Sequence, residues 1–475
     1  MNNIKLTFNN ALRITVFVLA IIVTFLLTGN TRLPMGMEYF PLVPFVFGVG
    51  YLLTKKTSLY IFKNIGLLGL NLALIIRYVI TPFFMWFNGH PIGRGTTPSP
   101  DNYKIAILLM ILEIIVIFLT IEIFSRKFYK EDKQLHTKRK IKVNINFVGA
   151  MFLLTTFVII IIYPVLLERY SFVLTASEYK KNIASNLPFG SLFPIMVSFS
   201  GLLLTVTILN EFYKKNEFKA NPTWIYLSIF IVFLISSFIT GTSRFSMVIP
   251  MVTGMYLITR LYPLYSKAIY SISGILILTT VSISTLVKQY GITLGGINNN
   301  ITNVTTSVSS SLQSYFSGVN NVATAVKARE VFRQDISFDL IASDLSSSVM
   351  LLGDKFSTNF GGVEMFNYAF YNNAISTDQI LPMIGQGYLY FGCFFSPVFV
   401  IVFTYFMMYF DSKSRKGKSV FEVYIYSYIA LRFGLFFMSN AIILTSFFTN
   451  SFLLLFIIIF LNNKFVLFDK EKSLI

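Results

Sequence analysis

The chain has 475 residues, of which 55% are hydrophobic, 17% aromatic and only 13% charged. Its mean hydropathy is +0.67, and so few polar residues cannot cover a soluble protein of this size. Composition therefore excludes an ordinary soluble protein and predicts an all-α, polytopic integral membrane protein. The net charge of +18 would suggest nucleic-acid binding in a soluble chain. Here the basic residues cluster in short loops between apolar runs, as topology and anionic lipid headgroups require, so we expect membrane lipid and no nucleic acid as a partner.

A membrane-spanning helix needs about 20 mostly apolar residues. About twelve stretches approach this length, and we expect each to form a transmembrane helix. They lie near residues 11–28, 39–54, 62–87, 104–124, 145–167, 189–210, 223–241, 245–260, 268–287, 385–410, 420–439 and 441–462. The chain then divides into nine helices within residues 1–287, a polar segment at 288–384, and three helices with a tail within 385–475.

The distribution of Lys and Arg predicts the orientation of these spans. With the N-terminus in the cytoplasm, the short inner loops receive most of the 39 basic residues, including the run from Arg126 to Lys142. Both termini then lie inside, and residues 288–384 form a large extracytoplasmic loop. Abundant Ile, Lys, Asn and Phe suggest an AT-rich bacterial genome, so we expect a multi-pass protein of the bacterial cytoplasmic (inner) membrane.

The large loop has its own helical patterns. Residues 321–335 contain no Gly or Pro and are rich in helix formers, so Arg329 and Arg333 are expected to share one helix face. A second, amphipathic helix is predicted by apolar residues at spacings of three and four. These residues are Phe338, Ile341, Leu345, Val349 and Leu352. Such a loop is expected to fold onto another part of the protein.

Three further arginines lie near the outer ends of predicted spans. Arg77 and Arg432 interrupt apolar runs, and Arg244 lies in a tight outer turn. Positive charge is costly there, and a shared anion-binding site would explain all three. The alternative is that each one reaches the headgroups or pairs with a carboxylate, such as Glu113 in the middle of a span.

The sequence contains little that indicates metal or cofactor chemistry. Its one cysteine, Cys393, lies in an apolar run, and its two histidines are His90 and His136. His90, in an outer loop, is either a general base or an ordinary loop residue. No phosphate-binding Gly-rich loop, dinucleotide-binding pattern or paired-cysteine metal site is present. We therefore expect neither a cofactor nor a metal.

The order of these features resembles the Wzy-type O-antigen or capsular polysaccharide polymerases, the oligosaccharide repeat unit polymerase family. Three segments carry the resemblance: Thr240-Gly241-Thr242-Ser243-Arg244 at a span junction, the large loop with Arg329 and Arg333, and Ile384-Gly385-Gln386-Gly387-Tyr388-Leu389-Tyr390-Phe391-Gly392 at the start of the next span. The family often has an acidic residue where this chain has Gln386-Gly387. This departure counts against a catalytic role for Gln386.

The resemblance implies a metal-independent, inverting glycosyltransferase of the GT-C type. Its substrate would be an oligosaccharide linked through pyrophosphate to undecaprenol, and a sugar hydroxyl of a second unit would attack the anomeric carbon. Arginines suit the departing pyrophosphate because they bind phosphate oxygens in pairs. We expect Arg244, Arg329 and Arg333 in this role, supported by Arg77 and Arg432. The resemblance also implies a chain-length regulator and a flippase of the same pathway as partners.

A general base is then needed near the acceptor hydroxyl. The outer loop offers five carboxylates for this role, with Asp335 favoured because it is nearest the arginine pair. They are Asp335, Asp339, Asp344, Glu364 and Asp378.

Three other functions stay open at this point. A lipid-linked oligosaccharide flippase or another secondary transporter would also be polytopic, but internal repeats typical of transporters are not visible. An O-antigen-ligase-like transferase would share architecture and substrate. A structural subunit of a polysaccharide export complex would not require arginines at the outer leaflet.

Overall fold

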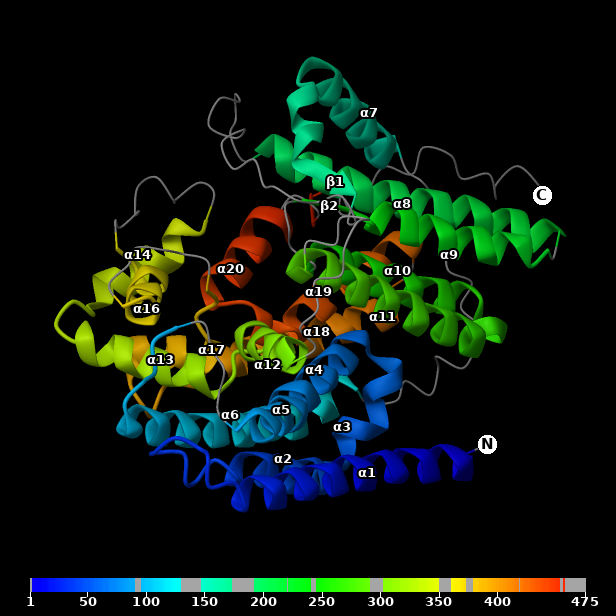
Figure 1. Cartoon of the computed structure of the whole chain (residues 1–475). Coiled ribbons are helices and arrows are strands. Elements are labelled where there is room, and N and C mark those ends of the chain that lie inside the picture. Colours follow the sequence, from blue (N-terminus) through cyan, green and yellow to red (C-terminus); the bar gives the residue numbers. More distant parts are fainter. Residues whose placement is uncertain are drawn as a thin grey trace. The chain divides into compact units, whose positions relative to one another are not determined.

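The computed structural model describes residues 2–89, 95–129, 147–172, 192–219, 221–240, 245–290, 302–349, 360–372, 379–417, 419–452 and 456–457. Helices dominate this part of the chain, together with two three-residue strands (Figure 1). Four helices among the described residues are long and apolar enough to cross a membrane, or five if the bent pair Met247–Leu261 and Pro263–Ile277 counts as one span. The four are Asn9–Thr28, Ile65–Asn88, Pro100–Phe128 and Leu192–Glu217. The predicted helical class, with apolar helices long enough to span a membrane, is therefore confirmed.

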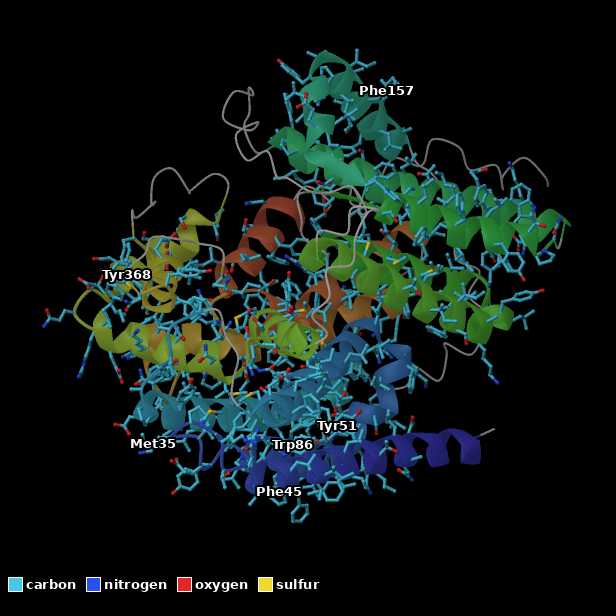
Figure 2. All side chains as sticks on the ribbon, in the orientation of Figure 1. Met35, Phe45, Tyr51, Trp86, Phe157 and Tyr368 are labelled. Atoms are coloured by element: carbon cyan, nitrogen blue, oxygen red, sulfur yellow. The ribbon has the colours of Figure 1, made fainter. Side chains whose placement is uncertain are left out.

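Each of the twelve predicted ranges contains a helix, but the number of spans stays a prediction because several of the helices are short. Large apolar side chains cover the outer faces of the helices, as membrane contact requires. Phe45 is 42% exposed and Phe157 is 63% exposed (Figure 2). These exposed side chains belong to helices predicted to be spans.

The described helices form two compact units. Unit 1 comprises Met1–Lys133, Asn300–Ser412 and Ile429–Asn450. Its elements are α1 (Asn2–Thr28), α2 (Leu42–Leu53), α3 (Lys55–Tyr60), η1 (Ile61–Lys63), α4 (Ile65–Ile75), η2 (Ile76–Ile80), α5 (Thr81–Asn88), α6 (Pro100–Phe128), α12 (Thr302–Tyr315), α13 (Val319–Val331), α14 (Phe338–Ser347), α16 (Gly362–Phe370), α17 (Met383–Phe391), η7 (Phe436–Met438) and α20 (Ala441–Ser446). Unit 1 thus contains the described helices of the large loop.

Unit 2 comprises Gln134–Asn299, Lys413–Tyr428 and Ser451–Ile475. Its elements are α7 (Phe147–Ile162), η4 (Pro164–Arg169), β1 (Tyr170–Phe172), α8 (Leu192–Lys219), α9 (Thr223–Ser236), β2 (Phe238–Thr240), α10 (Phe245–Leu261), η6 (Pro263–Tyr265) and α11 (Ser266–Tyr290). The two strands pair antiparallel, with Tyr170 opposite Thr240. Helices α18 (Val398–Lys416) and α19 (Val420–Gly434), and the π-helical η8 (Phe447–Phe452), have residues in both units.

The long helix α6 has clear start and stop signals. The Ser99 side chain accepts a hydrogen bond from the Asn102 amide, Pro100 opens the helix, and Asp101 lies in the first turn. Arg126 and Lys127 occupy the last turn. Negative charge at the start and positive charge at the end both match the helix dipole. Along its length α6 packs against α2 and α13.

Two close contacts fix α4 inside unit 1. The buried Asp411 carboxylate accepts hydrogen bonds from the Gly66 and Leu67 amides, each at 2.9 Å, and so caps the start of α4. Gly66 also lies against α19: a Cβ there would come within 2.7 Å of the Ala430 carbonyl oxygen, and a Cβ at Gly434 would overlap the Gly66 carbonyl oxygen. Small residues permit this backbone approach, as in other membrane helix pairs.

The predicted span 385–410 is interrupted in the structure. Helix α17 ends at Phe391, Gly392 follows with a φ of +77°, and α18 begins only at Val398. Such a φ favours glycine because it lacks a Cβ. Cys393, which was expected inside an apolar run, lies in the exposed turn between the two helices.

The loop helices are shorter than predicted. Helix α13 ends at Val331, so Arg333 lies in the following turn and does not share a helical face with Arg329. Helix α14 ends at Ser347, which leaves Val349 beyond it, and Leu352 lies outside the described residues. Phe338 is exposed, and the buried face of α14 includes the carboxylate of Asp344.

We predict that Gly434→Ala lowers the melting temperature of the purified protein, because the added methyl group overlaps the Gly66 carbonyl and overpacking costs about 1–3 kcal/mol. Gly201→Ala is the matched control, since a Cβ there meets no described atom within 4 Å. It should leave the melting temperature unchanged or raise it, because Ala favours helix over Gly. Thermal unfolding in detergent measures the melting temperature of each variant. Equal melting temperatures for the two variants would contradict the close packing of α4 and α19.

Candidate functional site

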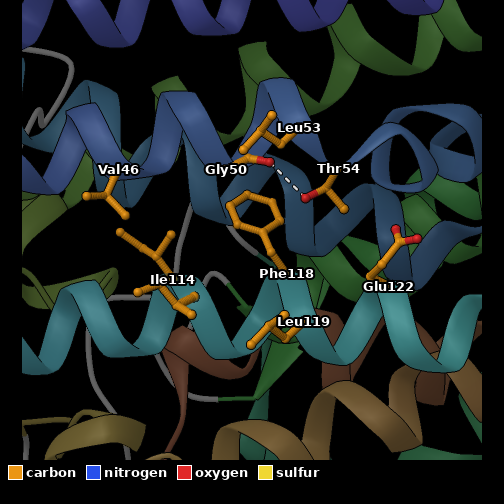
Figure 3. A pocket seen from close by; sticks show the side chains of 9 residues that line it. Val46, Gly50, Leu53, Thr54, Ile114, Phe118, Leu119 and Glu122 are labelled. Carbon is orange, nitrogen blue, oxygen red and sulfur yellow. Dashed lines mark hydrogen bonds between the residues drawn. The ribbon is translucent and has the colours of Figure 1, made fainter.

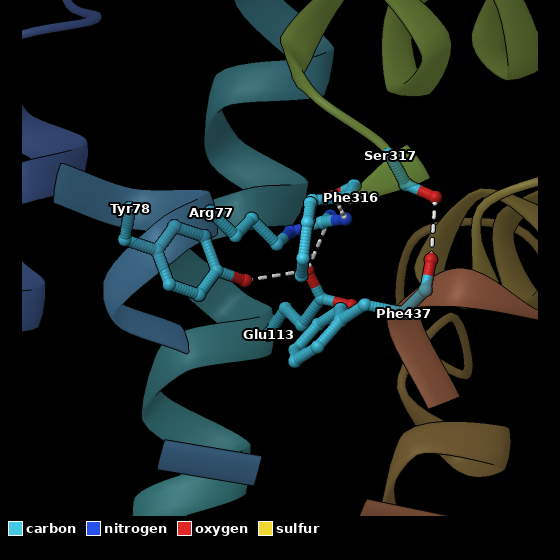
Figure 4. A network of polar contacts seen from close by, with 6 residues as sticks. All are labelled: Arg77, Tyr78, Glu113, Phe316, Ser317 and Phe437. Carbon is cyan, nitrogen blue, oxygen red and sulfur yellow. Dashed lines mark hydrogen bonds and ion pairs between the residues drawn. The ribbon is translucent and has the colours of Figure 1, made fainter. Parts of the chain in front are cut away.

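Arg77 is buried in unit 1 and pairs with Glu113. It lies in the π-helical segment η2, and its Nη2 is 2.7 Å from Oε2 of Glu113 on α6, with side-chain exposures of 1% and 0%. Tyr78 donates a hydrogen bond to the same carboxylate oxygen at 2.6 Å. The guanidinium carbon lies 4.7 Å from the centre of the Phe437 ring (Figure 4). Of the two interpretations of Arg77, pairing with a carboxylate is the one that the structure shows.

This ion pair also holds the large loop. Arg77 Nη1 donates to the Phe316 carbonyl oxygen at 2.7 Å, in the turn between α12 and α13. The next residue, Ser317, has a φ of +51° and donates from its hydroxyl to the Phe437 carbonyl at 2.9 Å. One buried arginine therefore links η2, α6 and the turn of the loop (Figure 4).

Three polar side chains beside this turn are buried without a hydrogen-bond partner among the described residues. They are the Ser309 hydroxyl, both ends of the Gln313 amide, and Nδ2 of Asn321. Ser309 and Gln313 are four residues apart on one face of α12, and the Gln313 amide lies against Gly318. By contrast Asn320, the neighbour of Asn321, accepts a hydrogen bond from Tyr103 at 2.8 Å. Unpaired buried amides are costly, so Gln313 and Asn321 stand out among the buried side chains of α12 and α13.

Arg329 holds the end of α17. Its Nη1 donates to the Tyr388 carbonyl at 2.6 Å and also to the Leu389 carbonyl. A cation at the last carbonyls of a helix satisfies unpaired acceptors and matches the helix dipole. The guanidinium also lies 5.4 Å from the Tyr388 ring centre, and a Cβ at Gly392 would lie 3.4 Å from Nη2. Arg329 is therefore next to the break between α17 and α18.

Exposed side chains follow both Arg329 and Gly392 in the chain. Arg333 is exposed. It follows Arg329 by four residues, just beyond the end of α13. Immediately after Gly392, Phe394 is 83% exposed and Phe395 is 60% exposed. Arg329 and two exposed phenyl rings thus border the chain just before α18.

A third polar cluster is structural. Asp344 Oδ2 accepts hydrogen bonds from the Gly362 amide, at 2.7 Å, and from the Tyr390 hydroxyl. Gln386 donates to the same hydroxyl at 3.2 Å and accepts from the Ala441 amide at 2.7 Å. These bonds join α14, α16, α17 and α20. An amide at position 386 can both donate and accept, whereas an ionised carboxylate only accepts.

The other predicted site residues that the structure describes differ in exposure and contacts. Asp335 and Asp339 are exposed, while Arg432 is half-buried with its guanidinium carbon 5.7 Å from the Phe447 ring centre. Arg77 and the pair Arg329 and Arg333 belong to separate clusters of contacts. Arg244, Asp378 and His90 lie outside the described residues.

Sequence reasoning missed Gln313, Asn321 and the role of Asp344. No local pattern distinguishes them, because their importance depends on burial and on partners distant in sequence. Asp411 had a weak signal, as an acidic residue at the end of the apolar run 398–410. No group of three or more His, Cys, Asp or Glu side chains is placed to hold a metal ion among the described residues.

No protein-family model, curated protein or solved structure matches this chain.

We predict that Glu113→Leu and Arg77→Met each destabilise the protein strongly, because losing one partner of a buried ion pair costs roughly 3–5 kcal/mol. The double variant should recover much of that loss, since no unpaired charge remains. The melting temperatures of the wild type, both single variants and the double variant in detergent provide the test. A double variant whose loss equals the sum of the two single losses would show that the two side chains are not coupled.

Proposed function

We propose that this chain is a membrane glycosyltransferase that joins undecaprenyl-pyrophosphate-linked oligosaccharide repeat units into a surface polysaccharide, as the Wzy-type polymerases do. It would act at the outer face of a bacterial cytoplasmic membrane, with about twelve spans and both termini inside. The main support is the turn at Gly392, which Arg329 borders and which the exposed rings of Phe394 and Phe395 follow, together with Arg333, which is exposed just beyond the end of α13. Cations suit a pyrophosphate, and exposed aromatic rings suit the adjoining lipid.

The proposed reaction is a single displacement. An acceptor sugar hydroxyl attacks the anomeric carbon of the donor, a new glycosidic C–O bond forms, and the C–O bond to the lipid pyrophosphate breaks. The electron pair of that bond leaves with the pyrophosphate, where Arg333 stabilises the new negative charge. The hydroxyl proton passes to a carboxylate base. Exposed Asp335, two residues after Arg333, is the favoured base, and Asp339 is the second candidate.

The remaining arginines have positioning roles in this scheme. Arg329 already donates to the Tyr388 and Leu389 carbonyls, so it fixes α17 and adds positive charge beside the turn. Arg77 is neutralised by Glu113 and sets the position of the α12–α13 turn. Asp344 is unsuitable as the base, because Oδ2 is engaged by the Gly362 amide and the Tyr390 hydroxyl.

The sugar portion would bind the polar face formed by Ser309, Gln313 and Asn321. Sugar hydroxyls both donate and accept, so they can satisfy an amide at both ends. Ser309 and Gln313 are fully buried, and α12 packs against α5 and α13. Binding therefore requires α12 to move away from these helices.

The proposal is tested with purified protein in nanodiscs and a lipid-pyrophosphate-linked repeat unit, analysed on a gel that resolves chain length. We expect a ladder of products without added nucleotide and in the presence of a chelator. A single unchanged band with the correct repeat unit would reject the polymerase and favour a transporter of the same lipid.

Variants of the two loop arginines separate binding from folding. We predict that Arg333→Ala abolishes the ladder without changing the melting temperature, because this side chain is exposed. Arg329→Ala should lower both polymer formation and the melting temperature, since losing a hydrogen-bonded charged group costs about 1.5–3 kcal/mol. Arg333→Lys should restore activity only partly, because Lys lacks the paired donors. Full-length polymer from Arg333→Ala would remove Arg333 from the site.

Two neighbouring asparagines provide a matched test of the sugar-binding face. We predict that Asn321→Leu keeps or raises the melting temperature, because an unpaired buried amide is removed, yet reduces polymer formation at low substrate concentration. Asn320→Leu should lower the melting temperature, because it leaves the Tyr103 hydroxyl without its partner. If Asn321→Leu has wild-type activity over the whole range of substrate concentration, this face does not bind sugar.

A further inference from the structure

An apolar groove lies between α2 and α6 in unit 1. It has a volume of about 350 Å³. The residues along it are Val46, Gly50, Leu53 and Thr54 of α2 and its end, and Ile114, Ile115, Phe118, Leu119 and Glu122 of α6 (Figure 3). Gly50 keeps the groove open above the Phe118 ring, because a Cβ there would come within 2.7 Å of that ring.

One end of the groove is charged. Lys56 pairs with Glu122 at 2.5 Å and also donates to its backbone carbonyl. This pair is neutral overall, so the net charge at this end comes from two exposed neighbours. Lys55 follows Thr54 directly, and Arg126 lies one helical turn beyond Glu122 on α6. The groove therefore runs from an apolar end to a basic end.

Its length corresponds to one leaflet. From Ile114 to Glu122, α6 rises about 12 Å, and half of the hydrocarbon core of a bilayer is roughly 15 Å. The basic end lies close to the C-terminal end of a helix that is long and apolar enough to span the membrane. An acyl chain in the groove would thus place its headgroup phosphate beside Lys55 and Arg126.

The groove opens at the membrane face opposite the large loop. The loop contacts the first turns of α6, where Tyr103 donates to Asn320, whereas the basic end lies near its last turns. A lipid whose phosphate is held near Arg333 would have its headgroup at the other surface. The expected occupant is thus distinct from the proposed substrate.

We propose that this groove is a binding site for one acyl chain of an anionic phospholipid in the leaflet at the basic end of α6. Its apolar walls hold the chain, and Lys55 and Arg126 select a headgroup with net negative charge. The site does not depend on the proposed enzymatic function.

The test uses the full-length protein, delipidated in detergent, with phosphatidylglycerol or phosphatidylcholine carrying the same photoreactive acyl chain. We expect phosphatidylglycerol to label peptides containing residues 46–54 and 114–122 more strongly than phosphatidylcholine. Lys55→Glu with Arg126→Glu should reduce that labelling, by roughly fivefold for each basic residue. Lys104→Glu, at the opposite end of α6, is the matched charge control and should label as wild type does.

A second variant tests the groove itself. Ile115→Trp enlarges a side chain that is 43% exposed, so it should fill the groove without disturbing the fold and reduce labelling by both lipids. Size-exclusion profiles confirm that each variant is folded. Equal labelling by the two phospholipids that is insensitive to the charge changes would overturn the proposal. Stronger labelling by a photoreactive polyprenyl phosphate than by phosphatidylglycerol would also overturn it and assign the groove to the substrate lipid.

Discussion

The buried pair of Arg77 and Glu113 is the constraint on which the organisation of unit 1 depends. Neither side chain reaches water, and an isolated charge at that depth would be very costly. Each partner therefore requires the other, which fixes η2 against α6. Because the same guanidinium holds the Phe316 carbonyl, the position of the loop turn is also fixed. The pair contributes more to choosing one arrangement than to overall stability, since desolvation offsets much of its attraction.

The described arginines among those expected at one anion site differ in burial and in contacts. Arg77 is neutralised by a carboxylate, and Arg329 is largely engaged by backbone carbonyls at the end of α17. Arg333 is exposed, just beyond the end of α13. A cation held by backbone acceptors keeps its full charge, so Arg329 still contributes to the local field. Arg329 thus places positive charge beside the turn that precedes the exposed rings of Phe394 and Phe395.

The sequence predicted the helical class well and the details of individual helices less well. Hydropathy located a helix in each predicted span, because apolar length is a property of the local sequence. It did not anticipate the break at Gly392, since a single glycine within an apolar run also occurs in continuous helices. The helix-forming residues of 321–335 predicted one helix with both Arg329 and Arg333, although α13 ends between them at Val331. For Arg77 the sequence left two interpretations open, and only the fold shows Glu113 beside it.

The polar network around Asp344 could not have been predicted from local patterns. Its partners are 18 residues away at Gly362 and 46 residues away at Tyr390. Gln386 looked like a departure from a family pattern, whereas its amide bridges Tyr390 and Ala441 in the structure. Its identity therefore follows from the need to donate and accept in one place. Such requirements become visible only when the tertiary contacts are known.

The glycine contact between α4 and α19 has a mechanical consequence. Backbone touches backbone at Gly66 and Gly434, and Asp411 clamps the start of α4, so these helices can neither slide nor rotate without a collision. Helix α14, by contrast, is joined to α16 and α17 by hydrogen bonds of one side chain, Asp344. Relative movement within unit 1 is therefore easier at α14 than between α4 and α19.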